Sequence, residues 1–344
     1  MSKLMFFQQK NSDGSGGRFA AQKTLFAAVI FLLLIIGAAL PASAIHFRNQ
    51  AYQSWEKGWQ AWQQGDKSSA LAFWSKHAFA ADLAPRPARL YYWRIRALED
   101  LGYYSEAEKL RAKLADKFPT DFYTFLLFPD GGLATSPDKI FLKKITKLFH
   151  PCPWREEVIK ASAVTGVSEG TIWSLMRRES KFRPHAVSQS GAVGLMQLMP
   201  STAMEEASFL KIKKSDIYLP CDNILLGASH FSRMNRKFRS ETVKSVAAYN
   251  AGASAVAGWG DLSACDWAEW VENIPYKETR EFVRSVLENR EVYRILYGFN
   301  ENSATLFSLT SQPFIPDMTE TPALRAKLKI KNNAKDELNN GRQP

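Results

Sequence analysis

A weak internal repeat, set in a long stretch of helical periodicity, constrains the fold of this chain more than any other feature. The segments AWQQGDKSSA (61–70) and ALEDLGYYSEA (97–107) share a leading Ala, a Gly, and a second Ala five residues after that Gly. Gly65 and Gly102 lie 37 residues apart. A Gly turn between small packing residues is typical of stacked helical hairpins. We therefore predict an all-α fold, with TPR-like helical-repeat hairpins over residues 45–128 and a second helical domain after them.

Large aromatic residues are concentrated in this repeat region. Ten Trp are present in the 344-residue chain. Packing between hairpins is the commoner use of such side chains, and a platform for stacking sugars is the alternative. We favour packing for the following set: Trp55, Trp59, Trp62, Phe73, Trp74, Tyr91, Tyr92 and Trp93.

The remainder of the chain divides by its turn signals and periodicity. Residues 129–153 hold Gly and Pro turn signals around the basic stretch LKKITKLF (142–149) and are expected to form a connector. Residues 154–300 return to helical periodicity, with Ser168 and Asp222 as expected helix N-caps and Thr279 as the expected start of the last helix. Residues 301–344 lose periodicity and are expected to be a mobile tail.

The N-terminus carries an export signal. Basic residues precede the apolar run LFAAVIFLLLIIGAAL (25–40), and Ala42-Ser43-Ala44 follows it. This order predicts a secretory signal peptide over residues 1–44 that is cleaved after Ala44. An uncleaved signal anchor, with membrane association through the same segment, is the alternative. Both alternatives place the rest of the chain in the periplasm.

The formal net charge of +11 favours an anionic partner. The basic residues are spread along the chain, and no nucleic-acid-binding motif is present, so we do not expect nucleic acid as a partner. Cys152, Cys221 and Cys265 have no metal-ligand spacing. A pairing of Cys221 with Cys265 and three unpaired thiols are both open.

Glu179 is the strongest candidate for a catalytic group. Ile172, Leu175 and Met176 share one helical face with it at spacings i, i+3, i+4 and i+7. A carboxyl group held against apolar neighbours stays protonated to higher pH and can act as a general acid. The alternative is a structural ion pair with one of the neighbouring cations, which are Arg177, Arg178 and Lys181.

Four motifs follow in order: ES (179–180), GLMQLMPSTA (194–203), AYNAG (248–252) and IPYKETR (274–280). Amide groups such as those of Gln197 and Asn250 suit acetamido and hydroxyl groups. Met196 and Met199 are expected to provide apolar walls. No further carboxylate lies within the first three motifs, and Glu205 and Glu206 just after the second are expected to have a helix-capping or dipole role.

With these motifs, residues 154–297 resemble the catalytic domain of soluble-type lytic transglycosylases, the SLT domain of the family-23-like glycoside hydrolases, which shares its fold with goose-type lysozyme. Residues 91–123 also resemble the helical-repeat region that precedes this domain. The resemblance implies a lysozyme-like α-helical catalytic domain after a shorter superhelix than that of the largest members.

The resemblance also implies roles for individual residues. Glu179 would be the catalytic acid/base, and Ser180 beside it would orient the substrate or the carboxylate. Glu278 would lie in a segment that folds back over the site. The glycan groove would be lined by Ser188, Gln197, Met199, Thr202, Tyr249 and Asn250.

The implied reaction cleaves the MurNAc-β-1,4-GlcNAc bond of peptidoglycan without water and leaves 1,6-anhydro-MurNAc ends. No metal or other cofactor is implied. A lysozyme-like muramidase on the same fold and a non-enzymatic peptidoglycan-binding scaffold are the alternatives. Expected partners are glycan strands and, through the helical repeats, proteins of the cell wall or of a secretion machine. Endo- or exo-cleavage, stem-peptide preference and the physiological setting stay open.

Overall fold

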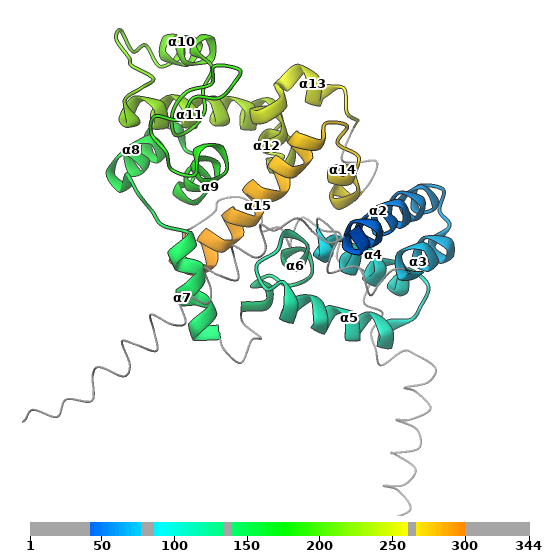
Figure 1. Ribbon diagram of the computed structural model, residues 1–344. Coiled ribbons are helices and arrows are strands. Elements are labelled where there is room, and N and C mark those ends of the chain that lie inside the picture. The colour runs from blue at the N-terminus through cyan, green and yellow to red at the C-terminus, as the bar shows by residue number, and fades with distance from the viewer. Residues whose placement is uncertain (1–41, 77–85, 134–138, 261–265, 300–344) are drawn as a thin grey trace, which may run out of the picture.

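The computed structural model describes residues 42–76, 86–133, 139–260 and 266–299. Within these ranges the regular elements are helices, joined by loops with two isolated β-bridges at Val187–Val193 and Val193–Leu198 (Figure 1). The predicted all-α fold is confirmed. No helix in the described ranges is both long and apolar enough to cross a membrane. The predicted apolar signal segment (25–40) and the predicted tail (301–344) lie outside them.

Two helical hairpins form the N-terminal region, as the repeat predicts. The first consists of α2 (Ala42–Gln63) and α3 (Lys67–Lys76), and the second of α4 (Pro87–Asp100) and α5 (Tyr104–Lys117). Gly65 and Gly102 lie at the two turns, each with φ of +81°. Glycine adopts this left-handed conformation without the steric cost that a Cβ would add. The repeated glycines therefore set the position of both turns.

The tryptophans of this region form one packed cluster. The rings of Trp55 and Trp59 stack with their centroids 5.6 Å apart, and Trp59 meets Trp93 edge-on at 4.9 Å. Trp62 and Trp74 complete the cluster, and all five side chains are buried. The prediction of packing between hairpins is confirmed, because buried rings of this kind are not available to stack on a sugar.

The segment between the hairpins and the C-terminal helices contains more structure than a plain connector. Helix α6 (Phe122–Leu127) is buried along its whole length and packs against α4 and α15. A 3₁₀ helix, η2 (Gly131–Leu133), follows, and then α7 (Lys139–Phe149), which contains the whole basic stretch LKKITKLF. None of the residues of α7 is buried.

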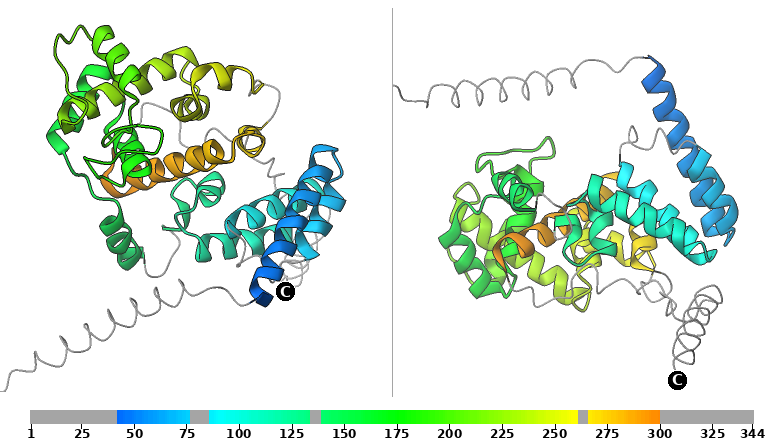
Figure 2. Two further views of the ribbon diagram at one scale, coloured as in Figure 1. Left: turned by 45° about the horizontal axis from the view of Figure 1, so that its top comes forward. Right: turned by 90° about the horizontal axis from the view of Figure 1, so that it is seen from below.

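The C-terminal region is built around one long helix, α15 (Lys277–Tyr297), which packs against α9, α12 and α6. The hairpin α2–α3 and the helices α8–α10 lie at opposite ends of the molecule, with α15 between them (Figures 1 and 2). The other helices of this region are α8 (Arg155–Thr165), α9 (Glu169–Ser180), α10 (Pro200–Phe209), α11 (Pro220–Lys237), α12 (Thr242–Ala251), α13 (Ala253–Ala257) and α14 (Trp267–Glu272).

The predicted helix starts have mixed outcomes. The side chain of Ser168 accepts a hydrogen bond from the backbone N–H of Thr171, so it is the N-cap of α9 as predicted. The prediction for Asp222 is wrong, because α11 begins at Pro220, whose fixed φ suits the first helical turn. The carboxylate of Asp222 instead accepts from the backbone N–H of Asp216 at 2.7 Å. The last helix begins at Lys277, two residues before the predicted Thr279.

A buried ionic cluster centred on Glu272 joins the repeat helices to α14 and α15. One carboxylate oxygen of Glu272 lies 2.5 Å from Nη2 of Arg284, and both side chains are almost fully buried. The hydroxyl of Tyr123 and the indole N–H of Trp93 donate to the other oxygen, Oε1. Arg89 lies 3.7 Å from Oε2, the oxygen that Arg284 pairs with. Burial opposes ionisation of Glu272, but the two arginines and these hydrogen bonds outweigh it and hold its pKa below the usual value. Helices far apart in the chain are therefore tied together.

Candidate active site

The site begins with Glu179, in the last turn of α9. Ile172, Leu175 and Met176 are fully buried on the same helical face, so the predicted apolar stripe exists. The helix ends at Ser180, and the next two residues, Lys181 and Phe182, have φ of +51° and +62°. Non-glycine residues adopt this region only where the surroundings enforce it. The chain therefore turns sharply just after Glu179 and leaves its half-buried carboxyl group at the end of the helix.

The surroundings of Glu179 favour its neutral form. Burial raises the pKa of Glu179 to about 8, the positive charge of Arg178 counteracts this, and the negative charge of Glu278 adds to it. Glu179 forms no ion pair with any residue in the described part of the chain. Arg177 instead donates to Asn289 at 3.1 Å. The geometry therefore favours a protonated acid over the structural ion pair that was the alternative.

A tightly held loop faces Glu179 and carries the GLMQLMP motif. Gly194 has φ of +80°, and a Cβ at this position would lie 2.3 Å from the amide nitrogen of Asn223. Asn223 accepts from the backbone N–H of Met196 at 2.8 Å and donates to the carbonyl of Val193 at 3.0 Å. Sequence reasoning missed Asn223, because nothing near it in the chain marks a contact 27 residues away. Met196, expected to wall the groove, is buried against Gly227 instead.

Gln197 is fixed by the same loop. Its φ is +48°, and its Nε2 donates to the carbonyls of Ala186 at 3.0 Å and Gly194 at 2.8 Å. The amide N–H groups are therefore used inside the protein, and the carbonyl oxygen Oε1 is the group left for a ligand.

The AYNAG motif contributes two side chains with fixed orientations. The hydroxyl of Tyr249 donates to the carbonyl of Met196 at 2.8 Å, and its ring stacks on Phe282. Oδ1 of Asn250 accepts from the hydroxyl of Thr279, which belongs to the IPYKETR motif, at 2.6 Å. Since Oδ1 is occupied, the Nδ2 amino group of Asn250 is the part left to donate to a ligand.

The four motifs surround one cavity of about 270 Å³. Every predicted site residue except Ser180 lines it. Ser180 is fully buried, and its hydroxyl donates to the carbonyl of Met176 at 3.1 Å, so the structure does not bring it to the cavity. The predicted residues on the wall are Glu179, Ser188, Gln197, Met199, Thr202, Tyr249, Asn250 and Glu278.

His230 on α11 also lines this cavity, and the sequence carried no signal for it. Its Nδ1 lies 3.1 Å from Oε1 of Glu206, a fully buried carboxylate that also accepts from Ser229 and Arg233. Burial opposes ionisation of Glu206, but these hydrogen bonds and the charge of Arg233 outweigh it and lower its pKa. The expected capping or dipole role for Glu206 is therefore wrong.

A larger cavity of about 500 Å³ lies elsewhere, between the start of α9 and the α11–α12 turn. Glu169 is the one carboxylate on its wall, and none of the motif residues reaches it. We therefore place the candidate site at the smaller cavity, where an acid with a raised pKa meets fixed amide groups.

The part of the chain that the structure describes contains neither a disulfide nor a metal-binding cluster. Cys152 is half-buried and Cys221 is exposed, and both are free thiols. Cys265 lies outside the described ranges. The same ranges contain no group of three His, Cys, Asp or Glu side chains arranged to hold a metal ion.

Comparison with known proteins shows what the C-terminal helices resemble. Residues 156–264 match the family model described as the transglycosylase SLT domain. The chain is 36% identical over 147 residues to a putative soluble lytic murein transglycosylase of Haemophilus influenzae, an alignment covering 41% of this chain and 24% of that protein. It is 36% identical over 143 residues to the soluble lytic murein transglycosylase of Escherichia coli, covering 40% and 22%. The chain thus spans about a quarter of the length of these curated relatives.

Membrane-bound lytic murein transglycosylase C of H. influenzae is 33% identical over 156 residues, covering 42% of this chain and 40% of that protein. Two solved structures share the fold. The 70-kDa soluble lytic transglycosylase in complex with bulgecin A has a TM-score of 0.57 at 18% identity, covering 79% of this chain and 54% of that one. An inactive mutant of the lytic transglycosylase Slt of Pseudomonas aeruginosa has a TM-score of 0.51 at 21% identity, covering 78% and 60%.

The resemblance drawn from the four motifs is therefore confirmed over residues 156–264, which match the transglycosylase SLT domain, and the fold is shared with solved soluble lytic transglycosylases.

Proposed function

We propose that this chain is a peptidoglycan lytic transglycosylase that cleaves the MurNAc-β-1,4-GlcNAc bond, with Glu179 as its single acid/base. One observation carries the proposal: the carboxyl group of Glu179, whose pKa is raised to about 8, lies on the wall of a cavity formed by all four motifs. The structural neighbour from P. aeruginosa is described as an inactive glutamate-to-glutamine mutant, which supports a glutamic acid as the essential group of that fold.

In the first step, protonated Glu179 donates its proton to the glycosidic oxygen. The bond from that oxygen to C1 of the muramic residue breaks, and the GlcNAc side leaves as an alcohol. The carbonyl of the muramic 2-acetamido group stabilises the positive charge at C1. The amino group of Asn250 and the free Oε1 of Gln197 are suited to bind the acetamido and hydroxyl groups of the glycan. An acid with a pKa near 8 is protonated at neutral pH, as this step needs.

In the second step, Glu179 is a carboxylate and takes the proton of the C6 hydroxyl. O6 then attacks C1 and closes the 1,6-anhydro ring, so no water is consumed and Glu179 is again protonated. The nucleophile belongs to the substrate itself, and its proximity to C1 replaces an enzyme nucleophile. Tyr249 and Met199 on the cavity wall are suited to limit water near C1.

A hydrolase on the same scaffold is the competing enzyme. It would need a water activated near C1, and Glu278 is the other carboxylate on the cavity wall. Product analysis separates the two reactions. Digestion of purified sacculi in ¹⁸O-labelled water should give unlabelled muropeptides that are one water lighter than hydrolytic products. Reducing ends that carry the label would establish a lysozyme-like muramidase instead. Binding to sacculi without any soluble product would favour the non-enzymatic scaffold.

The proposal includes a periplasmic location, supported by the N-terminal sequence and by relatives described as soluble or membrane-bound. It assigns residues 45–128 to the repeat domain, 129–153 to the connector and 154–300 to the catalytic domain.

A reporter fusion tests the periplasmic location. Alkaline phosphatase fused after residue 300 should be active, because this reporter folds only in an oxidising compartment such as the periplasm. An inactive but intact fusion would contradict this location. Mass spectrometry of the mature N-terminus would separate cleavage after Ala44 from a retained anchor.

The repeat helices are proposed to bind proteins of the cell wall or of a secretion machine. The exposed rings of Tyr52 and Tyr103, outside the buried tryptophan cluster, support a partner face on these helices. Cross-linking from these two positions in intact cells tests the proposal.

A further inference from the structure

Helix α7 presents an apolar surface to solvent that nothing in the described protein covers. Phe141 and Leu148 are 62% and 79% exposed, and Ile140 and Phe149 are 69% and 62% exposed. The helix lies at the periphery of the molecule, beside the C-terminal end of α15 (Figures 1 and 2). An apolar cluster of this size on a soluble surface marks a site of interaction. The α7 surface, as used below, consists of Phe141, Ile145, Leu148 and Phe149.

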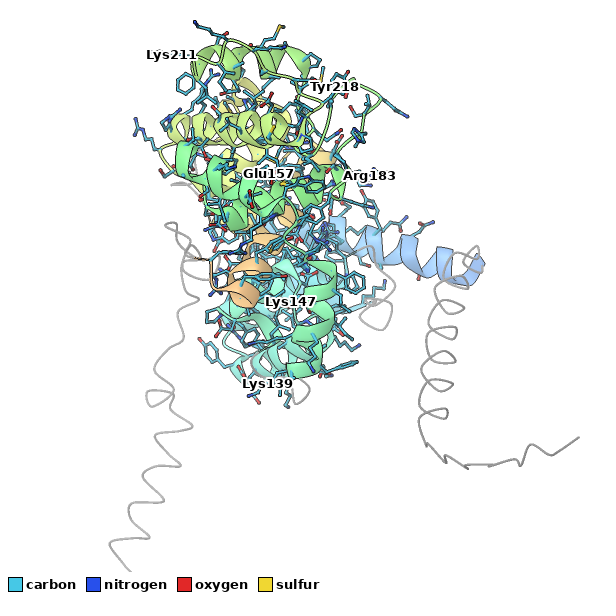
Figure 3. The ribbon with its side chains drawn as sticks, turned by 90° about the vertical axis from the view of Figure 1, so that its left-hand side faces the viewer. Lys139, Lys147, Glu157, Arg183, Lys211 and Tyr218 are labelled. Atoms are coloured by element: carbon cyan, nitrogen blue, oxygen red, sulfur yellow. The ribbon has the colours of Figure 1, made fainter. Side chains whose placement is uncertain are left out.

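Apart from Ile140, which shares a face with Lys144 and Lys147, the apolar and basic residues of α7 lie on different faces. Phe141, Ile145 and Leu148 follow one another at i, i+4 and i+7, so they form one stripe along the helix. Lysines occupy much of the remaining circumference, and α7 contains no acidic residue. Figure 3 shows Lys139 and Lys147 toward the two ends of the helix, at the surface of the molecule. The lysines are Lys139, Lys143, Lys144 and Lys147.

The exposed face has a fixed direction, because the C-terminal end of α7 is bonded to the catalytic helices. Arg177 donates to the carbonyl of Phe149, and the hydroxyl of Tyr297 donates to the carbonyl of His150 at 2.6 Å. Nε2 of His150 lies 3.2 Å from Oδ1 of Asn289. The C-terminal end of α7 is therefore anchored to α9 and α15, and Arg177 connects it directly to the helix that carries Glu179.

Charge decides between the partners that could cover this surface. A second copy of the chain would bring two sets of lysines together, which like-charge repulsion disfavours. A basic helix with an apolar face is the pattern of helices that lie in the headgroup region of a bilayer. Anionic headgroups would meet the lysines while Phe141 and Leu148 enter the acyl boundary. We propose that α7 binds the surface of a bilayer that contains anionic phospholipid. This inference does not depend on the proposed enzymatic reaction.

A fluorescent probe on α7 of the full chain tests the proposal. A Leu148→Cys variant, in a chain whose three native Cys are replaced by Ser, is labelled with an environment-sensitive dye and reconstituted into vesicles. One set of vesicles is phosphatidylcholine alone, and the other also contains phosphatidylglycerol. A second labelled variant, Val164→Cys, places the dye on the exposed side of α8 as a control. The N-terminal apolar segment is present in every sample, so tethering through it is equal.

With phosphatidylglycerol, the dye at position 148 should shift to the blue and be quenched by lipids that carry a quencher in the acyl chain. The dye at position 164 should show neither effect. Replacing Lys139, Lys143 and Lys144 with Gln should weaken docking of α7 roughly a hundred-fold, since each lysine near an anionic surface contributes about five-fold. The matched control replaces Lys211, Lys213 and Lys214, which are also exposed, and should leave docking unchanged.

Three results would overturn the proposal. The first is a dye at position 148 that stays in water with phosphatidylglycerol. The second is equal quenching in phosphatidylcholine alone or in the lysine variant. The third is a dye that is already shielded from water before vesicles are added. That result would mean that another segment of the chain or a second copy of it covers α7. Sedimentation would distinguish a monomer from a dimer and so decide between these two.

Discussion

Thr279 donates its hydroxyl to Oδ1 of Asn250 at 2.6 Å, and this bond joins the start of α15 to the end of α12. Thr279 is almost fully buried, whereas Asn250 lines the cavity. A buried residue of one motif thus orients the ligand-facing amide of another. The bond also gives Thr279 a role that its position in the IPYKETR motif alone does not indicate.

Replacing Thr279 with Val should weaken substrate binding, because the isosteric side chain cannot donate to Asn250. KM for soluble glycan fragments should rise several-fold, and unfolding should cost about 1 kcal/mol less. Thr279→Ser keeps the hydroxyl and should restore KM. A Val variant with unchanged KM, or a Ser variant as impaired as the Val variant, would show that this bond does not position Asn250.

Replacing Glu179 with Gln should leave the fold intact and reduce turnover of sacculi by a factor on the order of 10² to 10⁴. The amide keeps the size of the side chain but cannot donate the proton to the leaving oxygen. Glu205→Gln, on the exposed side of α10, is the matched control and should keep full activity. Turnover within a few-fold of wild type for the Glu179 variant would remove Glu179 from the mechanism.

The pH dependence follows from the raised pKa of Glu179. Its acid form is required for the first step, so kcat/KM should fall as the pH rises through about 8. The free energy of unfolding should also fall as the pH rises. The pKa of Glu179 is about 8 in the folded protein, above the ordinary value of 4.5. Between these two values the folded protein binds more protons than the unfolded chain, so it loses stability as the pH rises. The Glu179→Gln variant lacks this loss. Its melting temperature relative to wild type should therefore increase from about pH 5 to about pH 9, and a constant difference would contradict the raised pKa.

His230 should contribute to substrate binding through Nε2, since its Nδ1 is engaged by Glu206. His230→Ala should raise KM about five-fold, the effect of one lost hydrogen bond, with little change in kcat. Arg233→Ala removes a different partner of Glu206 without reaching the cavity, so it should lower stability and leave KM unchanged. Equal KM values for the two variants would mean that His230 acts only by supporting Glu206.

Replacing Glu272 with Ala should destabilise the whole described structure by roughly 3 to 5 kcal/mol, because buried Arg284 would lose its buried carboxylate partner and keep only the half-exposed Glu281, and Arg89 would lose the same carboxylate. Chemical denaturation measures the change. Asp130→Ala removes an exposed carboxylate 3.8 Å from Arg294 and should cost less than about 1 kcal/mol. The pKa of Glu272 is lowered, so its stabilising contribution is present above the ordinary pKa and is lost as the pH falls. A small effect of Glu272→Ala would mean that water enters the cluster.

Local patterns in the sequence determined most of the fold and the centre of the site. The turns at Gly65 and Gly102, the N-cap at Ser168 and the apolar stripe that ends at Glu179 each depend on residues within a few positions of one another. Such features follow from backbone conformation and helical periodicity, which the chain carries wherever it packs. The four motifs added the residues of the cavity wall through their resemblance to a known family.

Only the tertiary structure decided which polar groups face the cavity and which are enclosed. Ser180, next to Glu179 in the chain, points to the carbonyl of Met176, whereas His230 reaches the cavity from α11. Asn223 holds the loop at Met196, and Glu206 is surrounded by side chains of α11. The physical reason is the same in each case. Burial and hydrogen bonding are properties of groups brought together from distant parts of the chain, so the pKa and the free donors of a side chain are defined only once its neighbours are in place.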